Sequence, residues 1–141
     1  MIILDTNVVS ELMRPAPERR VLHWFSSQAT EDLHVTSVTM AEILHGIELV
    51  AGSRRRDALR GGAEKMFEGV FADHVLTFED RAARAFSQIA SSRRRQGKPM
   101  SVFDAQIAAI ARAHGATLAT RSPYAFEECG VRLVNPWEGS F

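Results

Sequence analysis

Short apolar runs alternate with longer amphipathic segments along the 141 residues of the chain. The apolar runs are typical of buried strands, and the segments between them have the periodicity of helices. The pattern predicts strands near 2–5, 33–36, 74–77, 116–119 and 131–134. It predicts helices near 7–12, 17–28, 38–51, 54–72, 79–97 and 102–114. Such alternation indicates an α/β fold with a central parallel sheet of four to five strands.

Two of the predicted helices carry an acid beside their apolar face. The stripe of the helix near 38–51 consists of Met40, Ile43, Leu44 and Ile47. The expected buried row of the helix near 102–114 consists of Phe103, Ile107 and Ile110. Glu42 and Asp104 fall outside these rows, so each is free to face a cleft. Ser101-x-x-Asp104 also resembles a capping box, a role that is compatible with metal binding.

The first apolar run ends abruptly at Asp5, which Thr6 and Asn7 follow. A strand that ends there delivers Asp5 to the carboxyl edge of the sheet, where ligands of open α/β sheets bind. The same residue is suited to cap the next helix. This segment alone does not decide between the two interpretations.

Three acids thus lie close to the ends of predicted elements: Asp5 at the end of the first strand, Glu42 early in the helix after the second, and Asp104 at the start of the helix near 102–114. We expect these acids to share one cleft. Two carboxylates about 4 Å apart repel by roughly 4 kcal/mol at an effective dielectric near 20, a penalty that a divalent cation removes. Oxygen ligands suit Mg²⁺ or Mn²⁺ rather than Zn²⁺. Such an ion activates water and stabilises charge on a phosphoryl group, which predicts metal-dependent phosphodiester hydrolysis.

Seventeen basic residues balance seventeen acidic ones, so no net charge draws the chain to nucleic acid or membrane. Basic residues do cluster at 54–56 and at 93–95 with Lys98, where they form either solvated helix faces or phosphate contacts. The helices near 54–72 and 79–97, which carry these clusters, could form a clamp or a partner surface.

Length and the apolar pattern predict a single domain over residues 1–141. No secretory signal and no apolar run of membrane-spanning length are recognisable, and Cys129 is the only cysteine, which excludes an internal disulfide. We therefore expect a cytoplasmic protein. Nucleophile elbows and glycine-rich nucleotide loops are missing from the sequence, so catalysis by a serine nucleophile and nucleotide binding are disfavoured.

Five segments in register resemble the PIN domains, and more narrowly the VapC/FitB-like toxins of bacterial type II toxin–antitoxin modules. They are Ile3-Leu4-Asp5-Thr6-Asn7, Thr39-x-x-Glu42, Phe103-Asp104-Ala105-x-Ile107-Ala108, Leu118-Ala119-Thr120-Arg121 and Val134-Asn135-Pro136-Trp137. The resemblance extends over essentially the whole chain and preserves order and spacing. It implies a three-layer α/β/α fold.

The resemblance also implies an endoribonuclease that depends on Mg²⁺, with Mn²⁺ as a substitute, and that commonly acts on tRNA or other structured RNA. By position, Asp5, Glu42 and Asp104 match the metal-binding acids, and Thr6 matches a hydroxyl that orients the site. Water then attacks phosphorus in line and leaves a 5′-phosphate and a 3′-hydroxyl. Arg121, Lys98 and the arginine clusters are candidates for phosphate contacts.

The partners implied by the resemblance are an RNA substrate, a second copy of the chain and a cognate VapB/FitA-like antitoxin. Such an antitoxin inserts a segment near the acidic cleft and carries the DNA-binding domain, so that DNA is contacted only through it. We expect Trp24 or Phe25 to be exposed, which is a weak independent hint of the homodimer.

One departure from the family concerns its fourth acid. After Thr120-Arg121, members of the family place an acid or Asn and often an Asp three residues later, where this chain has Ser122 and Ala125. A serine hydroxyl can orient water, but it adds no charge. An alternative function is therefore a catalytically weakened PIN domain that binds RNA or protein. A receiver-like regulatory domain ranks last, because the third strand region lacks a phosphoacceptor Asp.

Overall fold

The computed structural model describes residues 1–138, which contain five strands in one parallel sheet. The strands are β1 (Ile2–Leu4), β2 (Leu33–Thr36), β3 (Val75–Leu76), β4 (Thr117–Ala119) and β5 (Arg132–Val134). Their order in the sheet is β3-β2-β1-β4-β5, and each neighbouring pair is parallel. The chain therefore winds outward from β1 in one direction and returns to its other side with β4. Ligands of open α/β sheets bind beyond the carboxyl ends of the strands at such a reversal.

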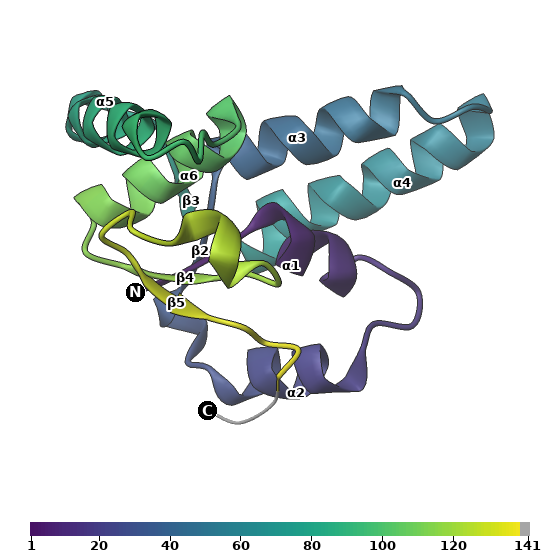
Figure 1. Ribbon diagram of the computed structural model, residues 1–141. Coiled ribbons are helices and arrows are strands. Elements are labelled where there is room, and N and C mark those ends of the chain that lie inside the picture. Colours follow the sequence, from purple (N-terminus) through teal and green to yellow (C-terminus); the bar gives the residue numbers. More distant parts are fainter. Residues whose placement is uncertain (139–141) are drawn as a thin grey trace.

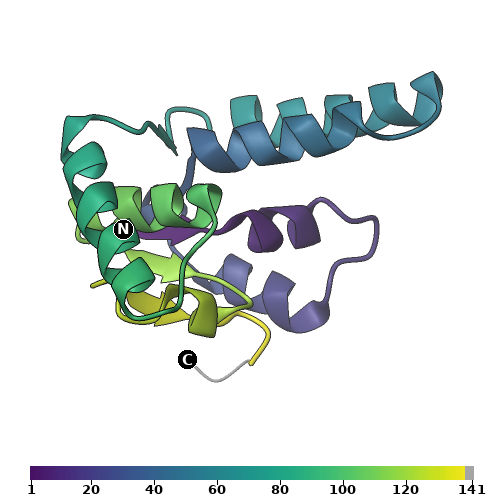
Figure 2. The same ribbon diagram turned by 45° about the horizontal axis from the view of Figure 1, so that its top comes forward.

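Helices connect the strands, as the predicted alternation requires (Figure 1). The helices are α1 (Thr6–Leu12), α2 (Arg19–Ser27), α3 (Ser37–Glu48), α4 (Ser53–Lys65), α5 (Asp80–Arg95) and α6 (Val102–Ala113). Short turns of other helix types are η1 (Thr30–Asp32), η2 (Met66–Val70) and η3 (Pro123–Phe126). In Figure 2, α3 and α4 lie side by side and extend beyond the sheet, while α5 packs against α6. None of the helices in residues 1–138 is long and apolar enough to cross a bilayer.

Two apolar clusters cover the two faces of the sheet, which gives the expected three layers. Successive residues of a strand point to opposite faces, and accordingly Ile3 belongs to one cluster and Leu4 to the other. The first cluster joins the sheet to α5 and α6 through residues such as Ile89 and Ile107. The second joins it to α1, α2, α3 and α4. The predicted α/β/α architecture is confirmed.

The expected helix near 54–72 is divided in the structure. The α-helical hydrogen bonds of α4 end at Lys65, and the wider π-helical turn η2 follows, in which the Phe71 N–H donates to the Met66 carbonyl at 2.8 Å. The wider turn leaves both Phe67 and Phe71 buried, at 5% and 1% exposure. The end of the helix near 102–114 is as expected, since Gly115 adopts a φ of 60° directly after it.

Three expectations about burial were wrong. Phe103 is 46% exposed. It stands in the first turn of α6, and the neighbouring residues 101 and 102 are exposed as well. Trp24 is only 4% exposed and packs inside the second cluster, so it offers no exposed surface for a homodimer. Arg93 is 7% exposed and donates to backbone carbonyls, so it is not available for a phosphate contact.

Candidate active site

The three acids singled out in the sequence line one open cleft of about 550 Å³. Asp5 comes directly after β1, Glu42 lies on α3 directly after β2, and Asp104 lies in the first turn of α6, before β4. The lining comprises Asp5, Thr6, Asn7, Ser10, Glu11, Arg14, Glu42, Asp104, Arg121 and Trp137. The parallel winding thus brings together acids that are far apart in the sequence.

Asp5 both caps a helix and belongs to the cleft. One carboxylate oxygen, Oδ1, accepts the Thr6 N–H at 2.8 Å at the start of α1, and the other, Oδ2, accepts the Thr120 hydroxyl at 2.8 Å. The side chain is 5% exposed. The cap is therefore confirmed and the residue does line the cleft, while its role as a ligand stays a prediction.

A relay of hydroxyls holds Glu42. The Thr6 hydroxyl donates to Glu42 Oε1 at 2.7 Å and lies 3.0 Å from the Thr39 hydroxyl. Because a hydroxyl has a single proton to donate, Thr39 must be the donor to Thr6. The buried Thr39 is itself fixed, since its N–H bonds to the Thr36 hydroxyl at the start of α3. Thr6 therefore orients the Glu42 carboxylate, and its role in catalysis stays a prediction.

Burial raises the pKa of all three carboxyls, and neighbouring carboxylates add to the rise at Asp5 and Glu42. Burial raises the pKa of Asp5 to about 6, against the lowering effect of its hydrogen bonds, and the nearby Asp104 and Glu42 raise it further. Burial also raises the pKa of Glu42, to which Asp104 contributes, and burial raises the pKa of Asp104. Within residues 1–138 none of the three forms an ion pair. The cleft therefore carries uncompensated negative charge.

This donor set fits a hard divalent cation. In the described part of the chain, no three His, Cys, Asp or Glu side chains stand close enough to hold a metal ion as they are arranged. Mg²⁺ needs no such set, because it is commonly bound through one or two carboxylates and keeps several waters. Asp5 and Asp104, which are partly dehydrated and mutually repulsive, offer such ligands.

Two of the predicted site residues lie outside the cleft lining. Ser122 is half-buried and its N–H donates to the Thr120 hydroxyl at 3.1 Å, so it is one contact away from Asp5. Lys98 is exposed beyond the end of α5. Of the predicted phosphate-binding residues, which also include the arginine clusters, only Arg121 lines the cleft.

The cleft also contains residues to which the sequence gave no site role. Glu11 is 7% exposed and accepts hydrogen bonds from Arg14 Nη1 at 3.0 Å and from the Glu18 N–H at 3.0 Å. This acid is thereby occupied in holding the segment after α1. The i,i+3 spacing of Glu11 and Arg14 is the sequence signal that could have revealed the pair. Trp137, quoted only as part of a motif, also lines the cleft.

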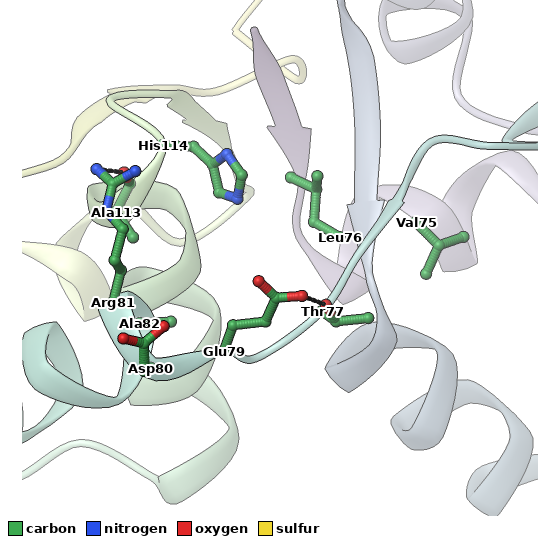
Figure 3. A pocket seen from close by; sticks show the side chains of 9 residues that line it. All are labelled: Val75, Leu76, Thr77, Glu79, Asp80, Arg81, Ala82, Ala113 and His114. Carbon is green, nitrogen blue, oxygen red and sulfur yellow. Dashed lines mark hydrogen bonds between the residues drawn. The ribbon is translucent and has the colours of Figure 1, made fainter.

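A second pocket lies away from these acids, between the start of α5 and the end of α6 (Figure 3). The Thr77 hydroxyl donates to Glu79 at 3.0 Å, and Arg81 donates to the Ala113 carbonyl at 2.7 Å. Thr77, Glu79 and Arg81 are thus engaged with one another or with backbone, and none of the predicted site residues lines this pocket.

The chain is similar in sequence and in fold to known proteins. The chain is 36% identical over 137 residues to toxin FitB of Neisseria gonorrhoeae, which covers 97% of this chain and 99% of the relative. It is 37% identical over 138 residues to VapC ribonuclease Y4jK of Sinorhizobium fredii, and the match covers 98% of this chain and 99% of that relative. The fold is similar to a solved structure of FitAB bound to an IR36 DNA fragment, with a TM-score of 0.88, 36% identity and 97% and 96% coverage.

The family model described as PIN domain matches residues 2–124. This range includes Asp5, Glu42 and Asp104 as well as Arg121. The matched range, the parallel sheet and the relatives agree: the chain belongs to the PIN domain family.

Proposed function

We propose that this protein is a metal-dependent endoribonuclease toxin of a type II toxin–antitoxin module. The observation that carries the proposal is the convergence of Asp5, Glu42 and Asp104 in one cleft. Burial raises the pKa of each, and repulsion by neighbouring carboxylates raises those of Asp5 and Glu42 further. The names of two relatives, a toxin and a VapC ribonuclease, support the toxin and the RNA substrate.

In this function Asp5 and Asp104 would hold Mg²⁺, or Mn²⁺ in its place. When bound, the cation would supply activation of water and stabilisation of charge on the phosphoryl group. The Thr6 hydroxyl donates to Oε1 of Glu42. The other carboxylate oxygen, Oε2, would then accept a proton from water in the cleft. Thr120 keeps the Asp5 carboxylate in one orientation from the side of β4.

RNA would be drawn to the cleft by its phosphates. The exposed Arg121 lies in the lining and supplies positive charge beside the acids. Contacts with the phosphate backbone supply most of the affinity without reading sequence. A tRNA or another structured RNA is the substrate that we propose.

The proposed protein partner is a cognate VapB/FitA-like antitoxin. An apolar groove between α1, α3 and α4 opens into the acidic cleft and shares Thr6, Ser10, Arg14 and Glu42 with it. A segment lying in this groove would reach the acids directly. The solved FitAB structure on DNA supports a DNA contact made by such a complex. The homodimer stays a prediction from the resemblance.

Cleavage of purified total tRNA by antitoxin-free protein tests the function. Cleavage is expected with Mg²⁺ or Mn²⁺ and not with EDTA. D5N and D104N should each lower the rate by about 100-fold or more, because each removes a ligand charge. Full activity of folded D5N would contradict the metal site.

The alternative, a catalytically weakened PIN domain, is favoured by one observation. Ser122 stands where the family has an acid, and it reaches Asp5 only through Thr120. If the missing charge limits catalysis, S122D should raise the cleavage rate about 10-fold or more, with S122N as the uncharged control. An unchanged rate in S122D would show that the serine is sufficient.

A further inference from the structure

The backbone of Arg121 is clamped from two sides. Its N–H donates to Asn7 Oδ1 at 3.3 Å, and Asn7 lies two residues after Asp5 on α1. Its carbonyl accepts the Asn135 side-chain amide at 3.3 Å. The preceding residue, Thr120, is bonded to Asp5. The position of the Arg121 backbone is thereby tied to the carboxylate at the centre of the cleft.

The guanidinium of Arg121 lies over the ring of Trp137, 5.1 Å from its centroid. The tryptophan is fixed in turn. Its backbone N–H donates to Asn135 Oδ1 at 2.9 Å, and its backbone carbonyl accepts from Arg20 Nη1 at 3.3 Å. Its side chain packs against the second apolar cluster. A guanidinium over an indole face is held by cation–π attraction and stacking. Asn135 therefore positions the arginine and its aromatic support at once.

The donors of this guanidinium are free for a ligand. Within residues 1–138, no side chain or carbonyl accepts a hydrogen bond from the Arg121 side chain, although four carboxylates line the same cleft. Arginine matches the geometry of a phosphate with two parallel N–H groups. An arginine that is held on a ring, but not bonded to an acid, is suited to receive an anion.

We propose that Trp137 is a positioning residue that presents Arg121 to a phosphate of the RNA backbone. The inference rests on the proposed function, and adds to it a segment beyond the 2–124 range of the family model. Without the ring, the long side chain of Arg121 samples many rotamers, and binding must order it. With the ring in place, most of that ordering precedes the arrival of RNA.

The experiment measures RNA binding and cleavage in a double-mutant cycle of Trp137 and Arg121. Binding of labelled total tRNA is followed by fluorescence anisotropy in the D5N background, so that it does not depend on cleavage. W137A and R121A should each weaken binding about 5- to 10-fold, and the double variant no more than about 2-fold beyond either. Each should also lower the salt dependence of log Kd by about 0.7–0.9, the loss of one phosphate contact.

Matched variants separate positioning from a general loss of structure. W137F keeps an aromatic face and should bind within about 3-fold of the parent, whereas R84A removes an exposed arginine on α5 and should change nothing. In the enzyme with Asp5 intact, W137A should raise KM with kcat unchanged, since the lost interaction is with the bound substrate.

Each other outcome contradicts one identifiable step. Independent, multiplying effects of W137A and R121A would overturn the inference and would indicate instead that a base stacks on the tryptophan. Unaltered binding in W137A would also overturn it, and so would an unchanged salt dependence. The parent protein could also bind tRNA tightly, with the coupled effects of W137A and R121A, and yet not cleave it. That result would disprove the proposed function, whereas the contact between Arg121 and a phosphate would still stand.

Discussion

At the scale of single residues, Asp5 combines a structural and a chemical role in one side chain. It caps α1 through the Thr6 N–H and stands at the edge of the cleft with 5% exposure. A carboxylate so buried is held at a cost, since the charged form loses hydration. Its hydrogen bonds from Thr6 and Thr120 offset only part of that cost, because its pKa is still raised to about 6. Such a cost is typical of residues kept for function.

The stability of the metal-free protein should consequently fall as pH rises from about 4 to 6. The folded state holds the Asp5 proton up to a pKa of about 6, whereas the ordinary value is 3.8, so the folded state binds more protons across this interval. D5N should remove this contribution and be more stable than the parent at pH 7 by roughly 2–3 kcal/mol. Urea denaturation in EDTA at several pH values measures the difference.

The D5N comparison isolates one carboxyl. Asparagine can accept the Thr6 N–H through its carbonyl oxygen and donate to the Thr120 hydroxyl, so the cap is kept. The raised pKa values of Glu42 and Asp104 act in the same direction in both proteins. Parallel stability curves for parent and D5N would refute the assignment.

At the scale of elements, Arg93 joins the end of α5 to two loops. Its Nε donates to the Lys98 carbonyl at 2.8 Å, and its Nη1 donates to the carbonyls of Ala125 and Glu127 at 3.0 Å each. A planar guanidinium can satisfy several carbonyls at once, and a buried carbonyl left without a partner is costly. The second basic cluster thus contains one structural arginine beside two exposed ones.

Replacement of Arg93 should be far more damaging than replacement of its neighbour. R93A is expected to lower the free energy of unfolding by about 2–4 kcal/mol, because the carbonyls lose their donor, and R93K should recover little. R94A, which removes an exposed side chain, should stay within about 0.5 kcal/mol of the parent. Chemical denaturation of the three variants provides the measurement, and equal effects of R93A and R94A would be inconsistent with this role.

At the scale of the whole molecule, the winding of the sheet assembles the cleft. Outward winding from β1 to β3 carries Glu42 on α3, and the return to β4 carries Asp104 on α6 to the other side of Asp5. The three acids have no ion-pair partners in residues 1–138, so folding without a cation concentrates negative charge. Any ligand that binds only the folded state then stabilises it.

Divalent cations should therefore raise the melting temperature at pH 7. At a concentration of about 100 times the dissociation constant, the gain is about 2.7 kcal/mol, which corresponds to several degrees for a chain of this size. The double variant D5N/D104N should show no gain with Mg²⁺ or Mn²⁺. Differential scanning calorimetry with and without EDTA decides the point, and identical melting temperatures of the parent in both conditions would argue against the cation.

The sequence by itself determined the elements and the chemistry each could supply. Periodicity and chain breaks depend on neighbouring residues, so the strands, the helices and the stop of α6 just before Gly115 followed from local pattern. The same holds for Asp5 at a strand end. Burial depends on distant residues, and for this reason Phe103, Trp24 and Arg93 were misjudged.

The tertiary structure alone decided which side chains meet. Strand order brought Asp5, Glu42 and Asp104 to one cleft, kept Lys98 out of it and left Ser122 one contact away. It also placed Trp137 beneath Arg121. The sequence pattern records the face on which a residue lies, whereas a contact across the sheet depends on how the chain is wound, because packing and charge act through space and not along the chain.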